Sequence, residues 1–168
     1  MFLSSFITKL TARIYYREMQ ETNFTISSAA EMQALGVKIG QQLKGQTVIE
    51  LVGDVGAGKT TLAKGIAAGM DIKDGVSSPS FTLSRSYQSP IGLRLHHYDF
   101  YRLDDIGLLA HQLQESLDDK QGITLIEWAK SATKILPENH VTIKIAAKSE
   151  NSRLVSISSE TNLVEDKK

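Results

Sequence analysis

Two kinds of apolar spacing alternate along the chain, and together they predict an α/β fold. Residues 48–52 and 123–126 are short, mainly apolar runs bounded by polar turns, which is typical of buried parallel strands. Further strands are predicted at residues 23–26, 81–87, 93–98, 141–146 and 154–158. Short turns join 81–87 to 93–98 and 141–146 to 154–158, so we expect an antiparallel hairpin from each of these pairs.

Apolar residues at helical spacing occur in three segments. The first segment begins with a capping box formed by Ser28 and Glu31, and Gly45 is predicted to be its C-cap. Its apolar positions are Met32, Leu35, Ile39 and Leu43. The other two predicted helices cover residues 60–70 and 104–118.

A glycine-rich stretch separates the apolar run 48–52 from the helix predicted after it. It matches the P-loop pattern G-x-x-x-x-G-K-[ST], and its residues are the nucleotide-binding candidates: Gly53, Asp54, Val55, Gly56, Ala57, Gly58, Lys59, Thr60 and Thr61. We expect positive φ at the three glycines, which lets backbone N–H groups approach phosphate oxygens. Lys59 is expected to bind the β- and γ-phosphates, and the Thr60 hydroxyl to bind Mg²⁺.

This motif predicts binding of a nucleoside triphosphate. It also makes the fold prediction more specific: a three-layer P-loop NTPase-type fold, whose mixed sheet has a parallel core and antiparallel hairpins.

A P-loop site also needs carboxylates, usually at the ends of neighbouring strands. Glu127 follows the run 123–126, and Asp99 follows the run 93–98. We assign Glu127 to the metal, directly or through water, because its strand is predicted to be the more central. Asp99 then orients the attacking water or shares the Mg²⁺ shell. Asp99, Lys59 and Glu127 are the catalytic candidates.

Four more polar or aromatic residues are placed near this site. Ser80 lies in the loop 77–81, where a hydroxyl can report the presence of a γ-phosphate. His97 is interpreted as a structural hydrogen-bonding residue and Arg102 as the partner of an acid. Trp128, the only tryptophan, is expected in the core or at an interface.

Length and composition restrict the remaining possibilities. The chain has 168 residues, no cysteine and a formal net charge of zero, and no block of lysine and arginine. We therefore expect one ATPase domain at residues 23–160, an N-terminal extension at 1–22 and a frayed tail at 161–168. Thiolate metal sites are excluded, and the lack of cysteine fits the reducing cytoplasm. Contact with RNA is expected only through partner proteins, and no apolar run is long enough for a membrane span.

The motifs in combination resemble the TsaE (YjeE) family, small bacterial P-loop ATPases of tRNA threonylcarbamoyladenosine synthesis. The resemblance rests on residues 53–61, Ser-Pro-Ser-Phe at 78–81, His-Tyr-Asp-Phe-Tyr-Arg at 97–102 and Glu-Trp at 127–128. It implies ATP hydrolysis that supports the TsaD–TsaB complex, which transfers threonylcarbamoyl to the adenosine beside the anticodon of ANN-decoding tRNAs.

The resemblance also implies residue roles. Lys59 would hold phosphates, Thr60 and Glu127 would bind Mg²⁺, and Asp99 would be catalytic. Ser80 stands where the family often has threonine. The resemblance also implies that the base of the nucleotide would be contacted from residues 27–30.

Three alternatives remain. A small-molecule P-loop kinase usually has an arginine-rich lid, which the few scattered arginines do not form. A GTP-dependent switch is disfavoured because the chain has no N-K-x-D motif. An ATP-sensing assembly factor would use ATP only to order the loop 77–81.

Overall fold

The computed structural model describes residues 19–164, and the segments 1–18 and 165–168 lie outside the described part. The chain forms β1 (Gln20–Ile26), α2 (Ala29–Gln42), β2 (Thr47–Val52), α3 (Lys59–Gly69), β3 (Ser84–Gln88), β4 (Arg94–Asp99), α4 (Leu109–Asp118), β5 (Gly122–Glu127), the 3₁₀ helix η1 (Ala129–Ala132), β6 (Val141–Ser149) and β7 (Ser152–Ser159).

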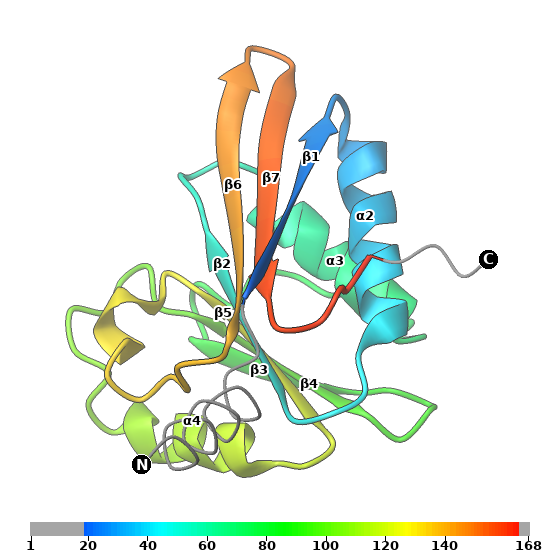
Figure 1. Ribbon diagram of the computed structural model, residues 1–168. Helices are drawn as coiled ribbons and strands as arrows, with labels where there is room; N and C mark the ends of the chain where they lie inside the picture. Colours follow the sequence, from blue (N-terminus) through cyan, green and yellow to red (C-terminus); the bar gives the residue numbers. More distant parts are fainter. Residues whose placement is uncertain (1–18, 165–168) are drawn as a thin grey trace, which may run out of the picture.

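All seven strands belong to one sheet, in the order β1-β7-β6-β2-β5-β4-β3 (Figure 1). The four central strands β6, β2, β5 and β4 run parallel to one another. At one side β7 runs antiparallel to β6 and β1, and at the other β3 runs antiparallel to β4. The predicted mixed sheet with a parallel core and antiparallel hairpins is confirmed.

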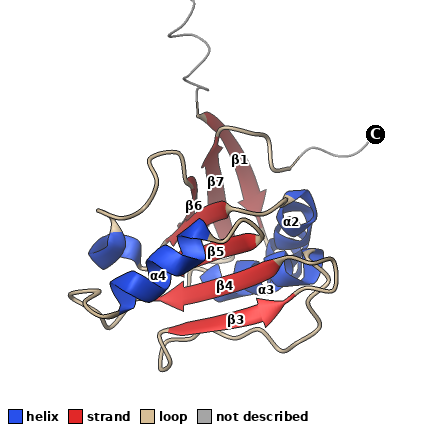
Figure 2. Ribbon diagram, turned by 90° about the horizontal axis from the view of Figure 1, so that it is seen from below, coloured by secondary structure: helices blue, strands red, loops and turns tan. Residues whose placement is uncertain are grey.

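Helices cover both faces of the sheet and complete three layers (Figure 2). The larger core lies between the sheet and helices α2 and α3, where Leu35, Ile39 and Leu62 are buried. A smaller core lies on the opposite face, where Leu113 of α4 and the residues of η1 pack near Phe100. A P-loop NTPase-type fold of three layers is therefore the observed architecture.

Helices α2 and α3 pack closely because four glycines meet in their contact. A Cβ atom placed on Gly36 would lie 2.8 Å from the Cα of Gly65, and one on Gly40 would lie 2.9 Å from the Cα of Gly69. Since both pairs advance together along the chain, the helices run in the same direction. Glycine is needed at these positions because any side chain would force the two backbones apart.

The first predicted helix is confirmed at its start and wrong at its end. The amide of Glu31 donates to Ser28 Oγ at 3.1 Å, while Glu31 Oε2 accepts from the amide of Ser27 at 2.8 Å. The helix ends at Gln42 with Leu43 as the C-cap in an extended conformation, so Gly45 is not the cap. Gly45 has φ +104°, and a Cβ there would lie 2.5 Å from the carbonyl oxygen of Lys120. Position 45 therefore requires glycine because the turn into β2 has positive φ and passes close to the backbone of Lys120.

Strand β3 and helix α4 both begin later than the sequence predicted. Strand β3 begins at Ser84 rather than at 81, because Leu83 has φ +65° and its amide bonds to the Pro79 carbonyl, which makes residues 81–83 a turn. Helix α4 begins at Leu109 rather than at 104, because an Asp105 carboxylate oxygen accepts from the amide of Gly107 and holds a turn there.

The two ends of the described region contribute more to the fold than the sequence indicated. Strand β1 begins at Gln20, which pairs with Ser159, so residues 20–22 belong to the sheet. Leu163 is buried in the larger core. The rest of the expected N-terminal extension, and the last four residues of the expected tail, lie outside the described residues.

Candidate functional site

The loop 53–58 joins the end of the central strand β2 to the start of helix α3. Gly56 and Gly58 have φ values of +77° and +113°, as predicted for this loop. Gly58 is the N-cap of α3 and makes no side-chain capping bond, so the amides of the first helical turn are left for an external acceptor. A Cβ on Gly56 would meet nothing within 4 Å, which places this part of the loop at open space. The arrangement suits an anion.

Gly53 is required for a different reason from the one predicted. It is not among the residues with positive φ. A Cβ at this position would instead lie 2.6 Å from the carbonyl oxygen of Ile145 in β6. Gly53 therefore allows the loop to leave β2 close beside its neighbouring strand.

Lys59 lies under the loop and is 6% exposed. Its Nζ donates to the carbonyl oxygens of Gly53 at 2.7 Å and Asp54 at 3.0 Å. Burial lowers the pKa of Lys59 below its ordinary value, although the negative charges of Glu127, Asp99 and Asp54 oppose this shift. The Lys59 ammonium group is thus held at the loop by two backbone carbonyls, within electrostatic reach of these carboxylates.

Trp128 forms the next part of the site. It has φ +60° and ψ +46°, a left-handed conformation that is uncommon for a large side chain and turns the chain sharply after β5. The Lys59 Nζ lies 4.2 Å from the centre of its ring, and the ring of Tyr101 packs against it at 4.8 Å. Trp128 is half-buried, and its ring lies at the nucleotide-binding candidate residues through a cation–π contact.

The two carboxylates stand side by side at the carboxyl ends of neighbouring strands. Asp99 and Glu127 are register partners in the parallel pair β4–β5, and both side chains are almost fully buried. The strand of Glu127 is the more central, as the sequence indicated. The Nε2–H of His97 donates to Glu127 Oε1 at 3.0 Å, so this histidine has the structural role expected of it.

Asp99 holds the loop 77–81 against the site. Its Oδ2 accepts from the hydroxyls of Ser78 at 2.6 Å and Ser80 at 2.5 Å, and its Oδ1 accepts from the amide of Tyr101. Burial raises the pKa of Asp99, but these hydrogen bonds outweigh burial and bring the pKa below its ordinary value. Asp99 is therefore ionised at neutral pH and connects Ser80 to the metal-site candidates.

Contrary to the prediction, Arg102 pairs with no acid among residues 19–164. Its guanidinium lies 4.9 Å from the ring centre of Phe81, a side chain that is 84% exposed. Both side chains are at the surface at the end of the loop 77–81, where the turn at residues 81–83 begins.

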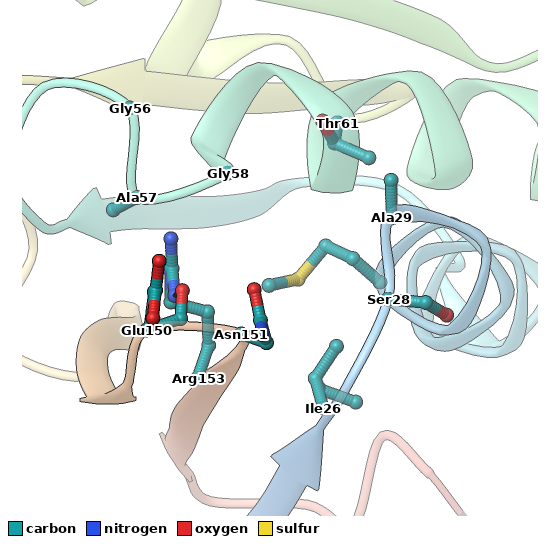
Figure 3. A pocket seen from close by; sticks show the side chains of 11 residues that line it. Ile26, Ser28, Ala29, Gly56, Ala57, Gly58, Thr61, Glu150, Asn151 and Arg153 are labelled. Carbon is teal, nitrogen blue, oxygen red and sulfur yellow. Dashed lines mark hydrogen bonds between the residues drawn. The ribbon is translucent and has the colours of Figure 1, made fainter.

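A cavity of about 290 Å³ extends from the loop to two other parts of the molecule (Figure 3). One is the start of α2, where Ser28 and Ala29 lie in the range 27–30 that the family resemblance indicated. The other is the tip of the β6–β7 hairpin, with Glu150, Asn151 and Arg153. Local sequence patterns predicted this hairpin but contain no sign that its tip reaches the loop, because that depends on β6 pairing with β2.

The donor set fits a magnesium ion bound together with phosphates. The hydroxyl of Thr60 and the carboxylates of Glu127 and Asp99 are hard oxygen donors, the type that Mg²⁺ prefers. Among residues 19–164 there is no cluster of three or more acidic, histidine or cysteine side chains able to enclose a metal. This is the usual situation for Mg²⁺, which takes one or two protein ligands and completes its shell with phosphate oxygens and water.

None of the helices in the described part of the chain combines the length and the apolar character needed to cross a bilayer.

Comparisons with known proteins agree with this geometry. The sequence profile described as "Threonylcarbamoyl adenosine biosynthesis protein TsaE" matches residues 26–155. Proteins described as "tRNA threonylcarbamoyladenosine biosynthesis protein TsaE" include one from Nostoc, 33% identical and covering 82% of this chain and 86% of the relative. Another is from Bacillus subtilis, 31% identical and covering 88% and 91%.

A solved structure is similar as well. The crystal structure of Bacillus subtilis YdiB superposes with a TM-score of 0.71 at 28% sequence identity, covering 87% of this chain and 90% of that one. Sequence and architecture lead to the same assignment: the chain belongs to the TsaE family and has its role in tRNA threonylcarbamoyladenosine biosynthesis.

Proposed function

We propose that this protein binds ATP with Mg²⁺ at residues 53–61 and hydrolyses it to ADP and phosphate. We further propose that hydrolysis in the cytoplasm supports the TsaD–TsaB complex, which transfers threonylcarbamoyl to the adenosine beside the anticodon of ANN-decoding tRNAs. The tRNA would be reached only through that complex, because the chain has a net charge of zero.

One observation carries the proposal. The ionised carboxylate of Asp99 and the carboxylate of Glu127 lie side by side at the strand ends that flank the loop, and both act electrostatically on Lys59. A phosphate-binding loop alone needs no such pair. Two acids next to the phosphate cradle are suited to holding a metal and orienting water for hydrolysis.

Each residue has a role in this proposal. Lys59 and the amides of residues 53–61 hold the phosphates, and Thr60 and Glu127 would hold Mg²⁺, which neutralises charge on the phosphates. Asp99 orients the attacking water through the remaining lone pair of Oδ1, or shares the metal shell. His97 keeps the Glu127 carboxylate in place by donating to Oε1.

Nucleotide binding can be followed through Trp128, the only tryptophan of the chain. Its ring lies 4.2 Å from the Lys59 Nζ, so a phosphate that draws this ammonium group toward itself changes the environment of the ring. Mg-ATP is therefore expected to change Trp128 emission in a saturable way, and calorimetry gives the affinity independently. No binding of Mg-ATP by either method would refute the proposal.

Hydrolysis is tested by phosphate release, with and without TsaD and TsaB. We expect slow turnover alone and faster turnover with both partners. Lys59→Ala should weaken nucleotide binding or turnover, whereas the exposed Lys64 of the same helix provides the matched control Lys64→Ala. Glu127→Gln keeps an acceptor for His97 but loses the charge, so Mg²⁺-dependent turnover should fall; the exposed Glu138 gives the control Glu138→Gln.

Two outcomes would select the alternative functions. Phosphoryl transfer to a small acceptor, without any response to TsaD and TsaB, would identify a P-loop kinase. Binding of ATP that promotes assembly with those partners, but with turnover unchanged by Glu127→Gln, would identify an ATP-sensing assembly factor.

A further inference from the structure

The cavity beside the phosphate-binding loop has two unlike walls. On one side Ile26 and Met32 are 7% and 3% exposed and present apolar surface from the β1–α2 junction. On the other side the tip of the β6–β7 hairpin contributes Glu150, Asn151 and Arg153. A flat heterocycle needs apolar surface against its faces and polar groups at its edge, and this cavity provides both.

The cavity is continuous with the phosphate-binding loop. Gly58 and Thr61 line it, and a Cβ on Gly58 would lie 3.3 Å from the Met32 Cε, so the apolar wall begins directly at the loop. A nucleotide whose phosphates lie on residues 53–61 therefore has its nucleoside end directed toward this cavity. This step rests on the proposed function.

The Asn151 side chain at the hairpin tip is available to a ligand and carries both a hydrogen-bond donor and an acceptor. Its side chain extends from the hairpin into the space below the start of α3 (Figure 3). No hydrogen bond to its amide comes from residues 19–164. The backbone that carries it is held in shape, because Arg153 Nη1 donates to the carbonyl oxygens of Ser149, Glu150 and Ser152 around the turn.

We propose that Asn151 reads the nucleobase and makes the site prefer adenine to guanine. A carboxamide presents one donor and one acceptor side by side. Adenine presents the complementary pair, an N6–H donor next to the N7 acceptor, whereas guanine presents two acceptors, O6 and N7, at the same edge. Guanine therefore leaves one of the two hydrogen bonds unmade. Discrimination of roughly 5- to 100-fold is expected from one such bidentate contact.

The experiment compares three probes by calorimetry in the presence of Mg²⁺: ATP, GTP and inorganic tripolyphosphate. Wild-type protein should bind ATP more tightly than GTP by roughly 5- to 100-fold. Asn151→Ala should weaken ATP binding by roughly 5- to 100-fold, bring the affinities for ATP and GTP close together, and leave tripolyphosphate binding unchanged. Asn139→Ala, an exposed asparagine before the start of β6, should match the wild type with every probe.

The outcomes separate this inference from the proposed function. Equal ATP affinity in Asn151→Ala and wild type, or equal affinity of the wild type for ATP and GTP, would overturn the role of Asn151 while triphosphate binding stands. A parallel loss of ATP and tripolyphosphate binding in Asn151→Ala would also overturn it, because it would show an effect on the phosphate site. Wild-type protein that binds neither ATP nor tripolyphosphate would overturn both.

Discussion

Replacing Gly40 by alanine tests the packing that places α2 against α3. The new Cβ would lie 2.2 Å from the carbonyl oxygen of Ile66 and 2.9 Å from the Cα of Gly69, while ordinary contacts begin at 3.4 Å. Both neighbours are backbone atoms, which cannot turn away as a side chain can. The two helices therefore have to separate by about 1 Å, and a gap of that size loses a quarter to a half of the dispersion energy of the contacts that line it.

Two opposing effects decide the size of the change. Alanine in a helix interior is favoured over glycine by about 1 kcal/mol. Overpacking costs typically about 1–3 kcal/mol, and more where only backbone can move. Since the clash at Gly40 is with backbone on the facing helix, we expect overpacking to win, with a net loss of about 1–3 kcal/mol in the free energy of unfolding.

The measurement is urea unfolding followed by circular dichroism, with the denaturation midpoint and the m-value fitted together. Gly75→Ala is the control, because a Cβ at Gly75 meets nothing within 4 Å; it should leave stability unchanged or raise it by up to about 1 kcal/mol. If Gly40→Ala were as stable as the wild type, with the same m-value, the close approach of α2 and α3 would not be the constraint described here.

Three further predictions concern polar contacts, each tested by unfolding with urea. Asp119 accepts two hydrogen bonds from Arg94, which hold its pKa below the ordinary value. The stability advantage of wild type over Asp119→Asn should therefore be complete above about pH 4 and shrink only at lower pH. An advantage that persisted undiminished to about pH 2 would contradict this prediction. The hydrogen bond to Glu50 raises the pKa of His140. Below about pH 6.5 the free energy of unfolding of the wild type should therefore exceed that of His140→Gln by about 0.5 kcal/mol, and this difference should vanish as the pH rises toward about 9. A difference that stays constant with pH would refute the linkage. Tyr98 is buried and its hydroxyl bonds to α4, so Tyr98→Phe should cost about 1 kcal/mol, whereas an unchanged midpoint would show that this bond contributes nothing.

The features that the sequence alone determined are those that depend on neighbours along the chain. The capping box of Ser28 and Glu31, the strand before the loop 53–58 and the helix after it follow from local hydrogen bonds and apolar spacing, and each is present. The acids at the ends of two strands were also found, since residues that follow parallel strands gather at one edge of a sheet. Where a turn competed with a weak periodic pattern, as before Leu109, the local prediction failed.

Only the tertiary structure decided what lies across from these elements. Sequence spacing does not show that Gly40 faces Gly69. A glycine inside a helix only lowers the predicted helix propensity, and its role in close packing becomes visible once the partner helix is known. The contact of Lys59 with Trp128 likewise depends on a left-handed turn after β5 that no local preference favours. Asn151 reaches the cavity because β6 pairs in parallel with β2, a long-range pairing whose register is set by the packed sheet as a whole.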